Sequence, residues 1–194
     1  MIQLHATKKL MACLPLGSSG QFAVTARSQS LYDQPPLAEN PLSGWHGNLV
    51  MFQRRNSVLL VHDATRIPLL LPALTKPDFA ALNDHFVDAF MNTLLKCDAS
   101  ETQMNAAQRY LRPLQVDTVC NRSEQGTLNQ LKGEVEAYLD NGGNIAEMTG
   151  YALGAWLASM WRSIKGQPYI RPNREMLTLL DGLTQKTDAA ANDA

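Results

Sequence analysis

Cysteine is scarce in this chain, and its placement excludes the common cysteine-based sites. The 194 residues contain Cys13, Cys97 and Cys120, an odd number with no CxxC pair or other metal-ligand spacing. This pattern is typical of reduced thiols rather than of a disulfide framework or a zinc site. It predicts a cytoplasmic protein.

Excess charge and long apolar runs are also missing. The formal net charge is −1, so no bulk electrostatic bias points to nucleic acid or to an acidic membrane. The N-terminal segment has no positive region ahead of a long apolar run, and therefore does not resemble a usual signal peptide. The longest apolar helix candidate, residues 145–160, contains Glu147 and is shorter than the roughly 20 residues that span a bilayer. We expect no membrane partner.

The segment that organises the chain is residues 45–71. Its apolar runs 49–52, 58–61 and 67–71 are separated by short polar turns, which is typical of strands. Because the connections are too short for helical crossovers, the three strands are expected to form an antiparallel meander. Pro68 cannot donate to a ladder, so the third strand is predicted at an edge or a bulge.

The first turn of this meander decides which side chains share a face. A three-residue loop, residues 54–56, is predicted because Asn56 tolerates the left-handed conformation. Phe52 would then lie opposite Val58, and Asn48 opposite His62. With the two-residue period of a strand, one face would carry His46, Asn48, Val50, Phe52, Val58, Leu60 and His62.

Helical periodicity dominates the second half of the chain. Alternation at Ile2, Leu4 and Ala6 predicts an opening strand, and residues 116–120 form another short β run. Apolar stripes and caps predict about five helices, at residues 77–97, 100–113, 123–142, 145–164 and 173–183. Early strands and late helices predict an α+β fold: an antiparallel sheet covered on one face by these helices.

The domain organisation follows from the same patterns. We expect one domain over residues 1–183, with a long loop or insertion at 16–44 and a C-terminal helical extension at 143–183. Residues 184–194 are predicted to be a disordered tail. The predicted core comprises Leu4, Leu49, Val50, Phe52, Val58, Leu60, Phe86, Phe90, Leu131 and Trp156.

Three blocks carry a resemblance to a known family. LHATKKL, WHGNLVMFQRRNSVLLVHDAT and TVCNRSEQGTLNQL together resemble an uncharacterised bacterial domain family of unknown function, associated with plasmid and other mobile-element genes. The blocks span residues 2–131, and the segment after about 142 is expected to be particular to this protein. The resemblance implies a shared α+β fold and no activity.

The first polar cluster is His5, His46 and His62, with Asn48 beside them on the predicted face. Three histidines with an open position are a zinc arrangement, but no HxH or HExxH spacing is present. The alternative is hydrogen-bonded strand histidines, and we predict neither a metal nor a cofactor.

The second cluster is Asn121, Arg122 and Ser123, at a strand-to-helix junction. The free amides of a helix start, with Arg122 nearby, are one way to hold an anion. No Gly-rich cradle and no following lysine accompany them, so a P-loop is excluded. The alternative, which we favour, is that Ser123 caps the helix and Arg122 ties down the preceding loop.

The third cluster is positive charge at Lys8, Lys9, Arg54 and Arg55. Together with Arg122 these residues would form a nucleic-acid surface only if all five lay on one continuous face. No exposed aromatic is interleaved with them, as RNA-stacking platforms require. Solvated turn residues are the alternative reading.

No catalytic signature is present, so the chain is interpreted as a non-enzymatic binding or regulatory module acting through a protein partner. The alternative is a nucleic-acid-binding or nucleic-acid-processing protein that uses the small basic patch. Self-association is a further possibility, because Gly150, Gly154 and Ala158 recur every four residues along the predicted 145–164 helix. Either this small-residue groove is an internal contact, or it or an adjacent Trp stays exposed as a dimer or partner site.

Overall fold

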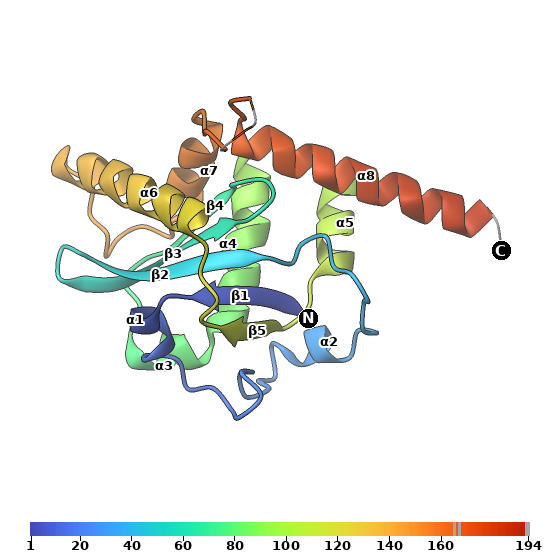
Figure 1. Ribbon diagram of the computed structural model, residues 1–194, viewed down its shortest axis with the longest axis horizontal. Coiled ribbons are helices and arrows are strands. Elements are labelled where there is room, and N and C mark those ends of the chain that lie inside the picture. Colours follow the sequence, from blue (N-terminus) through green and yellow to red (C-terminus); the bar gives the residue numbers. More distant parts are fainter. Residues whose placement is uncertain (165, 167, 193–194) are drawn as a thin grey trace.

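A computed structural model describes residues 1–164, 166 and 168–192, with side chains described as far as residue 185. Five strands form a single mixed sheet in the order β4-β3-β2-β1-β5 (Figure 1). Their bounds are β1 Ile2–Ala6, β2 Trp45–Phe52, β3 Arg55–His62, β4 Pro68–Leu71 and β5 Leu114–Asp117.

The predicted antiparallel meander accounts for only three of the five strands. β2, β3 and β4 are antiparallel neighbours, and β4, which begins at Pro68, forms one edge of the sheet as expected. β1 instead runs parallel to both β2 and β5. The prediction of a purely antiparallel sheet was wrong, because periodicity identifies strands without showing how segments distant in the sequence pair.

The turn between β2 and β3 differs from the predicted one. It has two residues, Gln53 and Arg54, both with positive φ (45° and 64°), as in a type I′ turn. Phe52 therefore pairs with Arg55, and Trp45 pairs with His62. This register differs from the predicted one by three residues, an odd shift that moves every β3 side chain to the opposite face.

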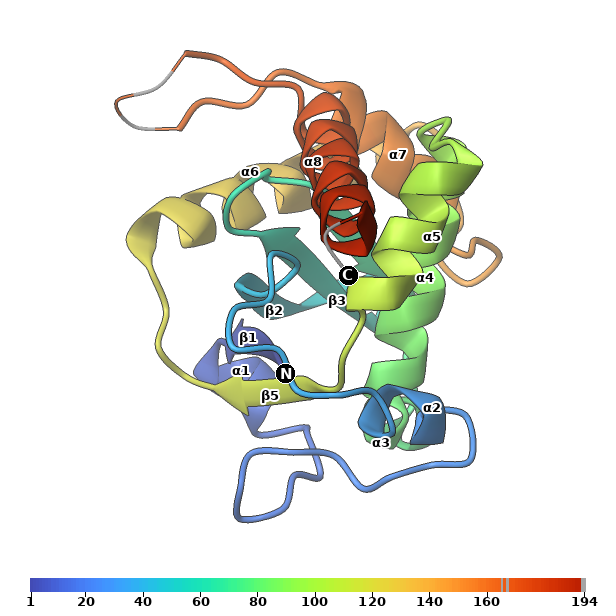
Figure 2. The same cartoon turned by 90° about the vertical axis from the view of Figure 1, so that its right-hand side faces the viewer.

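Helices cover both faces of the sheet rather than one (Figure 2). α4 (Leu82–Lys96) and α5 (Glu101–Tyr110) lie on one side, and α6 (Arg122–Asp140) lies on the other. The remaining helices are α1 Lys8–Met11, α2 Gln29–Tyr32, α3 Lys76–Ala80, α7 Tyr151–Ser159 and α8 Pro172–Asn192. Amphipathic stripes predicted the larger helices, but a stripe does not state which face of a sheet it meets.

Two apolar clusters result, one on each face. The larger joins all five strands to α4, α5 and α8, and contains Leu4, Trp45, Phe86 and Phe90. The smaller joins β2, β3 and β4 to α6 and α7, and includes Phe52, Leu59, Leu128 and Leu131. Nine of the ten predicted core residues are buried, and Trp156, at 47% exposed, is the exception.

Residues 16–44, predicted as a long loop, contain the short helix α2 and lie along the β5 edge of the sheet. Gln21 forms an antiparallel bridge to Gln115, and the backbone amide of Val116 donates to Gly20. Leu42 is buried and its carbonyl accepts the indole N–H of Trp45 at 2.8 Å. The segment therefore covers the edge of β5 and joins the core before the chain enters β2.

The C-terminal region departs from the predicted 145–164 helix. Only α7 is helical there. It begins at the left-handed Gly150, where an added Cβ would lie 2.3 Å from the carbonyl oxygen of Leu70. A Cβ on Gly154 would contact Thr93 and Pro68, and Ala158 is buried. The small-residue stripe is thus an internal contact with α4 and β4.

The last helix is longer than predicted, and none of the described helices can act as a membrane span. α8 continues to Asn192, through most of the predicted tail, and residues 193–194 lie outside the described residues. Within the part of the chain that the structure describes, no helix is both long and apolar enough to cross a bilayer.

Candidate functional site

Two predicted site residues meet where α6 begins. His5 of β1 pairs in register with His46 of β2, and their ring centroids are 4.8 Å apart. Each ring has its own carboxylate: the Nδ1 atoms of His5 and His46 lie 2.7 Å from Asp117 and Asp63, respectively. Parallel pairing of β1 and β2 therefore brings together two histidine–aspartate pairs that lie far apart in the sequence.

His46 holds the junction between β5 and α6. Its Nε2 accepts the backbone N–H of Asn121 at 2.9 Å, so the ring proton is assigned to Nδ1, which faces Asp63. The side chain is buried and both ring nitrogens are occupied. Since neither nitrogen offers a lone pair, His46 acts as a structural link rather than as a metal ligand.

His5 has the same kind of carboxylate contact, but its second ring nitrogen differs from that of His46. Asp117 also accepts from the side chain of Gln3 and the backbone of Val119, which fixes its position. Nε2 of His5 has no hydrogen-bond partner among the described residues, and the side chain is 19% exposed. An oriented imidazole of this kind resembles the base of a catalytic triad.

No nucleophile completes such a triad in the described part of the chain. The thiol of Cys120 donates to the carbonyl of Ala6 at 3.5 Å, and Ser123 accepts from Arg66 at 3.1 Å. Among the described residues neither is hydrogen-bonded to His5. The geometry therefore supplies an oriented imidazole without the nucleophile that acyl transfer requires.

His62, predicted beside the other two, lies on the opposite face of the sheet. The two-residue turn pairs it with Trp45, and its Nδ1 lies 3.0 Å from the hydroxyl of Thr65. Burial lowers the pKa of His62 to about 4, and the nearby Asp63 only partly offsets that effect. Across the described residues, no group of three or more His, Cys, Asp or Glu side chains could hold a metal ion.

The start of α6 is capped by a residue other than the one predicted. Asn121 accepts the backbone N–H of Ser123 at 3.0 Å, whereas the Ser123 hydroxyl contacts Arg66. Arg66 is buried in an ion pair with Glu124, in the first turn of α6. The Glu124 carboxylate thus already provides negative charge at the N-terminus of α6, where the sequence suggested an anion site. Arg122 is exposed.

The five predicted cationic residues do not form one continuous surface. Gln53, at the tip of the hairpin beside Arg54 and Arg55, hydrogen-bonds to Gly143 and Ile145, just beyond the end of α6. Arg122 lies at the other end of this 19-residue helix, about 28 Å away. Lys8 and Lys9 are exposed on α1.

A small polar groove continues from the histidine pair between α6 and the strands. Thr7 and Asn48 lie two residues beyond His5 and His46, and Gln125 and Asn129 follow Asn121 at helical spacing. These four side chains and Leu128 line a hollow of about 190 Å³, which we call the amide groove. Asn48, grouped with the histidines from the sequence, lies in this groove and accepts the Thr7 hydroxyl at 3.0 Å.

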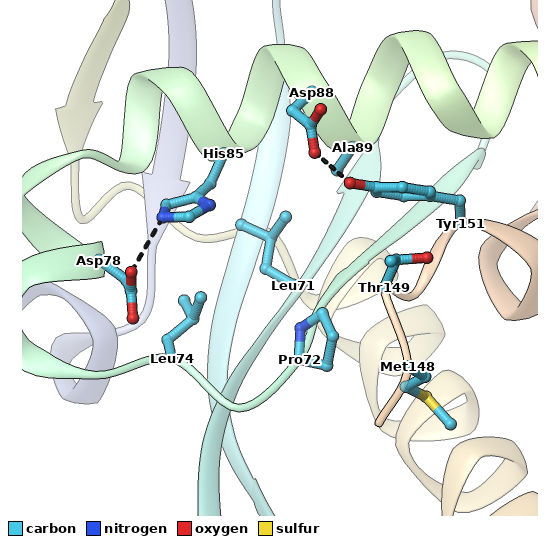
Figure 3. A pocket seen from close by; sticks show the side chains of 10 residues that line it. All are labelled: Leu71, Pro72, Leu74, Asp78, His85, Asp88, Ala89, Met148, Thr149 and Tyr151. Atoms are coloured by element: carbon cyan, nitrogen blue, oxygen red, sulfur yellow. Dashed lines mark hydrogen bonds and ion pairs between the residues drawn. The ribbon is translucent and has the colours of Figure 1, made fainter. Parts of the chain in front are cut away.

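A second hollow of about 220 Å³ lies between α4 and the start of α7 (Figure 3). Figure 3 shows two polar pairs on its walls, Asp78 with His85 and Asp88 with Tyr151, above the apolar Leu71 and Leu74. The hydrogen bond to Asp88 raises the pKa of Tyr151 to about 12.

The polar groups of this hollow are already engaged. Burial alone would raise the pKa of Asp78, but hydrogen bonds from Thr75 and the contact with His85 outweigh burial and lower it. Asp78 completes the capping box of α3, while Asp88 binds both Tyr151 and Asn92. These contacts hold α3 and α7 against α4. They account for the positions of the polar side chains in the hollow without a ligand.

Exposed aromatic side chains gather where α6 and α7 meet. Trp156 is 47% exposed, and its ring centroid lies 6.5 Å from that of Tyr138 on α6. Trp156 also lines a hollow of about 330 Å³ with Lys96, Asp98, Ser159 and Asn173. We call Tyr138, Trp156 and the lining of this hollow the Trp156 surface.

One comparison with known proteins identifies a family. No curated protein and no solved structure matches the chain. A family model described as a domain of unknown function, DUF6933, matches residues 3–175. The match extends well beyond the residues 2–131 that carried the resemblance in the sequence, and includes the segment expected to be particular to this protein. The chain belongs to the DUF6933 family.

Proposed function

We propose that this protein is a non-enzymatic binding module that acts through a protein partner docked on the Trp156 surface. The observation that carries the proposal is the exposure of Trp156 and Tyr138 beside a hollow of about 330 Å³. Large aromatic side chains flanking a pocket are the usual anchors of protein interfaces, and tryptophan and tyrosine are enriched among binding hot spots.

The chemistry of the surface indicates the kind of partner. Ala152, Ala155 and Trp156 give the hollow an apolar side, and Lys96 and Asp98 give its rim one charge of each sign. A partner that inserts one apolar side chain, with polar groups around it, would match this arrangement. The resembled family is associated with plasmid and other mobile-element genes. The first partner to test is therefore a cytoplasmic protein encoded beside the gene for this chain.

Affinity capture from the native host, followed by a binding measurement with the purified partner, tests the proposal. Trp156→Ala should weaken binding at least tenfold, as expected for the loss of a hot-spot tryptophan. Met51→Ala is the matched control, since Met51 is also exposed but lies at the β2–β3 hairpin. Equal affinity of wild-type protein and Trp156→Ala for the captured partner would contradict the proposal.

A second copy of the chain is the other occupant that the same experiment distinguishes. Light scattering at tens of micromolar should give a monomer for wild-type protein if the partner is another protein. A dimer that dissociates in Trp156→Ala would make the surface a self-association site and replace the proposed partner. Nucleic-acid binding is not proposed as a second function, because the five cations do not share a surface.

A further inference from the structure

We propose that the amide groove binds a single nucleobase, presented as a nucleoside or a nucleotide. The groove is formed by Thr7, Asn48, Gln125, Leu128 and Asn129, and lies away from the α6–α7 junction where the Trp156 surface is found. This site and its ligand are independent of the proposed protein partner.

Unused hydrogen-bonding groups distinguish the amide groove from the hollow of Figure 3. The side-chain amides of Gln125 and Asn129 have no hydrogen-bond partner among the described residues, and Asn48 uses only its oxygen, toward Thr7. In the hollow of Figure 3, by contrast, each carboxylate already has two partners within the chain. The side-chain amides without a partner among the described residues therefore line the amide groove.

The chemical class of the ligand follows from these groups. A primary amide presents a donor and an acceptor side by side, which matches the adjacent donor and acceptor on the edge of a base. Among the described residues no charged side chain lines the groove, and Leu128 offers an apolar contact for one face of a ring. The hollow of about 190 Å³ is smaller than the roughly 300–1,000 Å³ of pockets that enclose drug-sized ligands, so it has room for one small ring and not for a whole nucleotide.

The surroundings of the groove favour a nucleotide over other amide-bearing molecules. Lys8 and Lys9 follow the groove-lining Thr7 directly in the sequence and are exposed, so they are the cations that would hold the phosphate of a bound nucleotide. The base edge would face the amides, and the phosphate the lysines.

Titration calorimetry or ligand-observed NMR with the four ribonucleosides and their 5′-monophosphates tests the inference. At least one nucleoside should bind with millimolar or tighter affinity, and its monophosphate more tightly. Gln125→Leu and Asn129→Leu should each weaken nucleoside binding at least tenfold. Gln130→Leu, an exposed neighbour on α6 outside the groove, is the matched control and should bind as wild type.

Two outcomes would overturn the inference. One is the absence of binding by any nucleoside or monophosphate to folded wild-type protein. The other is binding of monophosphates alone that is lost in a Lys8→Ala, Lys9→Ala double variant and retained in the two amide variants, since this would indicate a phosphate site without base recognition. Thermal unfolding of each variant verifies that the fold is intact. Trp156→Ala should leave nucleoside binding unchanged.

Discussion

The two faces of the sheet are held together in different ways. Toward α4 the face is apolar, and Trp45 packs edge-on against Phe86 and Phe90 at centroid distances of 5.1 and 5.8 Å. Toward α6 the face is apolar across β3, β4 and the second half of β2. Over β1, β5 and the first half of β2 it carries Gln3, His5, His46, Asn48, Gln115 and Asp117. Packing of apolar side chains therefore provides most of the stability of the fold. The hydrogen bonds of the polar side chains position the loop that leads from β5 into α6.

The largest effect is expected on the apolar face. Phe90→Ala should lower the free energy of unfolding by about 3–5 kcal/mol, because it removes a fully buried aromatic ring and leaves a cavity. Urea titration measures the change. Leu95→Ala, at an exposed position on the same helix, is the control and should cost under about 0.5 kcal/mol. A loss below about 1 kcal/mol for Phe90→Ala would contradict the view that packing on the α4 face provides most of the stability.

His62 tests what a polar group costs on that same face. Burial lowers its pKa to about 4, whereas an unfolded chain binds the proton near 6.5. Well above pH 6.5 the residue is neutral in both states, so it adds no pH dependence to the free energy of unfolding. As the pH falls from 6.5 to 4 the unfolded state gains the proton first, so stability should fall by about 3 kcal/mol in total.

The variant His62→Gln isolates this contribution from those of the other histidines. Its free energy of unfolding should fall less steeply than that of the wild type as the pH drops from 7 to 5. Over this range the wild type should lose about 2 kcal/mol more than the variant. Urea titrations at several pH values provide the measurement. Parallel curves for the two proteins would mean that His62 binds its proton as readily in the folded state as in the unfolded state.

A smaller effect is expected on the polar part of the other face. His46→Leu should cost about 1–3 kcal/mol, because it leaves the amide of Asn121 without its acceptor and Asp63 without its donor. Hydrogen exchange at Asn121 should accelerate by more than the global change in stability predicts. Unchanged protection at Asn121 would show that His46 does not hold the junction.

The outer surface of α6 gives the smallest expected change. Lys132 and Glu136 form an exposed pair at 3.0 Å with four-residue spacing. Lys132→Ala should cost no more than about 0.5 kcal/mol in urea titration, and less in high salt. A cost above about 1 kcal/mol would mean that the surface ion pair of α6 contributes as much to the free energy of unfolding as the hydrogen bonds between α6 and the sheet.

Local patterns predicted most of the elements, and partners distant in the sequence account for most of the errors. Capping at Ser100 and the apolar stripe through Phe86 and Phe90 are local features, and both occur in the structure. The pairing of His5 with His46 joins segments separated by the 16–44 segment, so periodicity carries no information about it. One signal could have helped: parallel strands need a long connection, and residues 7–44 provide one.

The candidate site was predictable in its members but only partly in its arrangement. Of the three histidines grouped from the sequence, His5 and His46 lie side by side, whereas His62 lies on the opposite face of the sheet. The loop was predicted around Asn56, whereas Gln53 and Arg54 adopt the positive φ angles despite being neither Gly nor Asn. Asp117, Asp63 and Gln125 were missed because a carboxylate or an amide outside any motif gives no signal until the fold places it beside a partner.

The mixed sheet also has a consequence for the order in which the chain folds. Short connections join β2, β3 and β4. Pairing of β1 with β2 instead closes a loop of residues 7–44, and β5 follows α4 and α5 in the sequence, so its pairing with β1 closes a longer loop. Loop closure costs entropy before the contacts it permits can form, so the hairpins should appear early and β1 and β5 late. The histidine pair and the amide groove would then be among the last parts of the molecule to assemble.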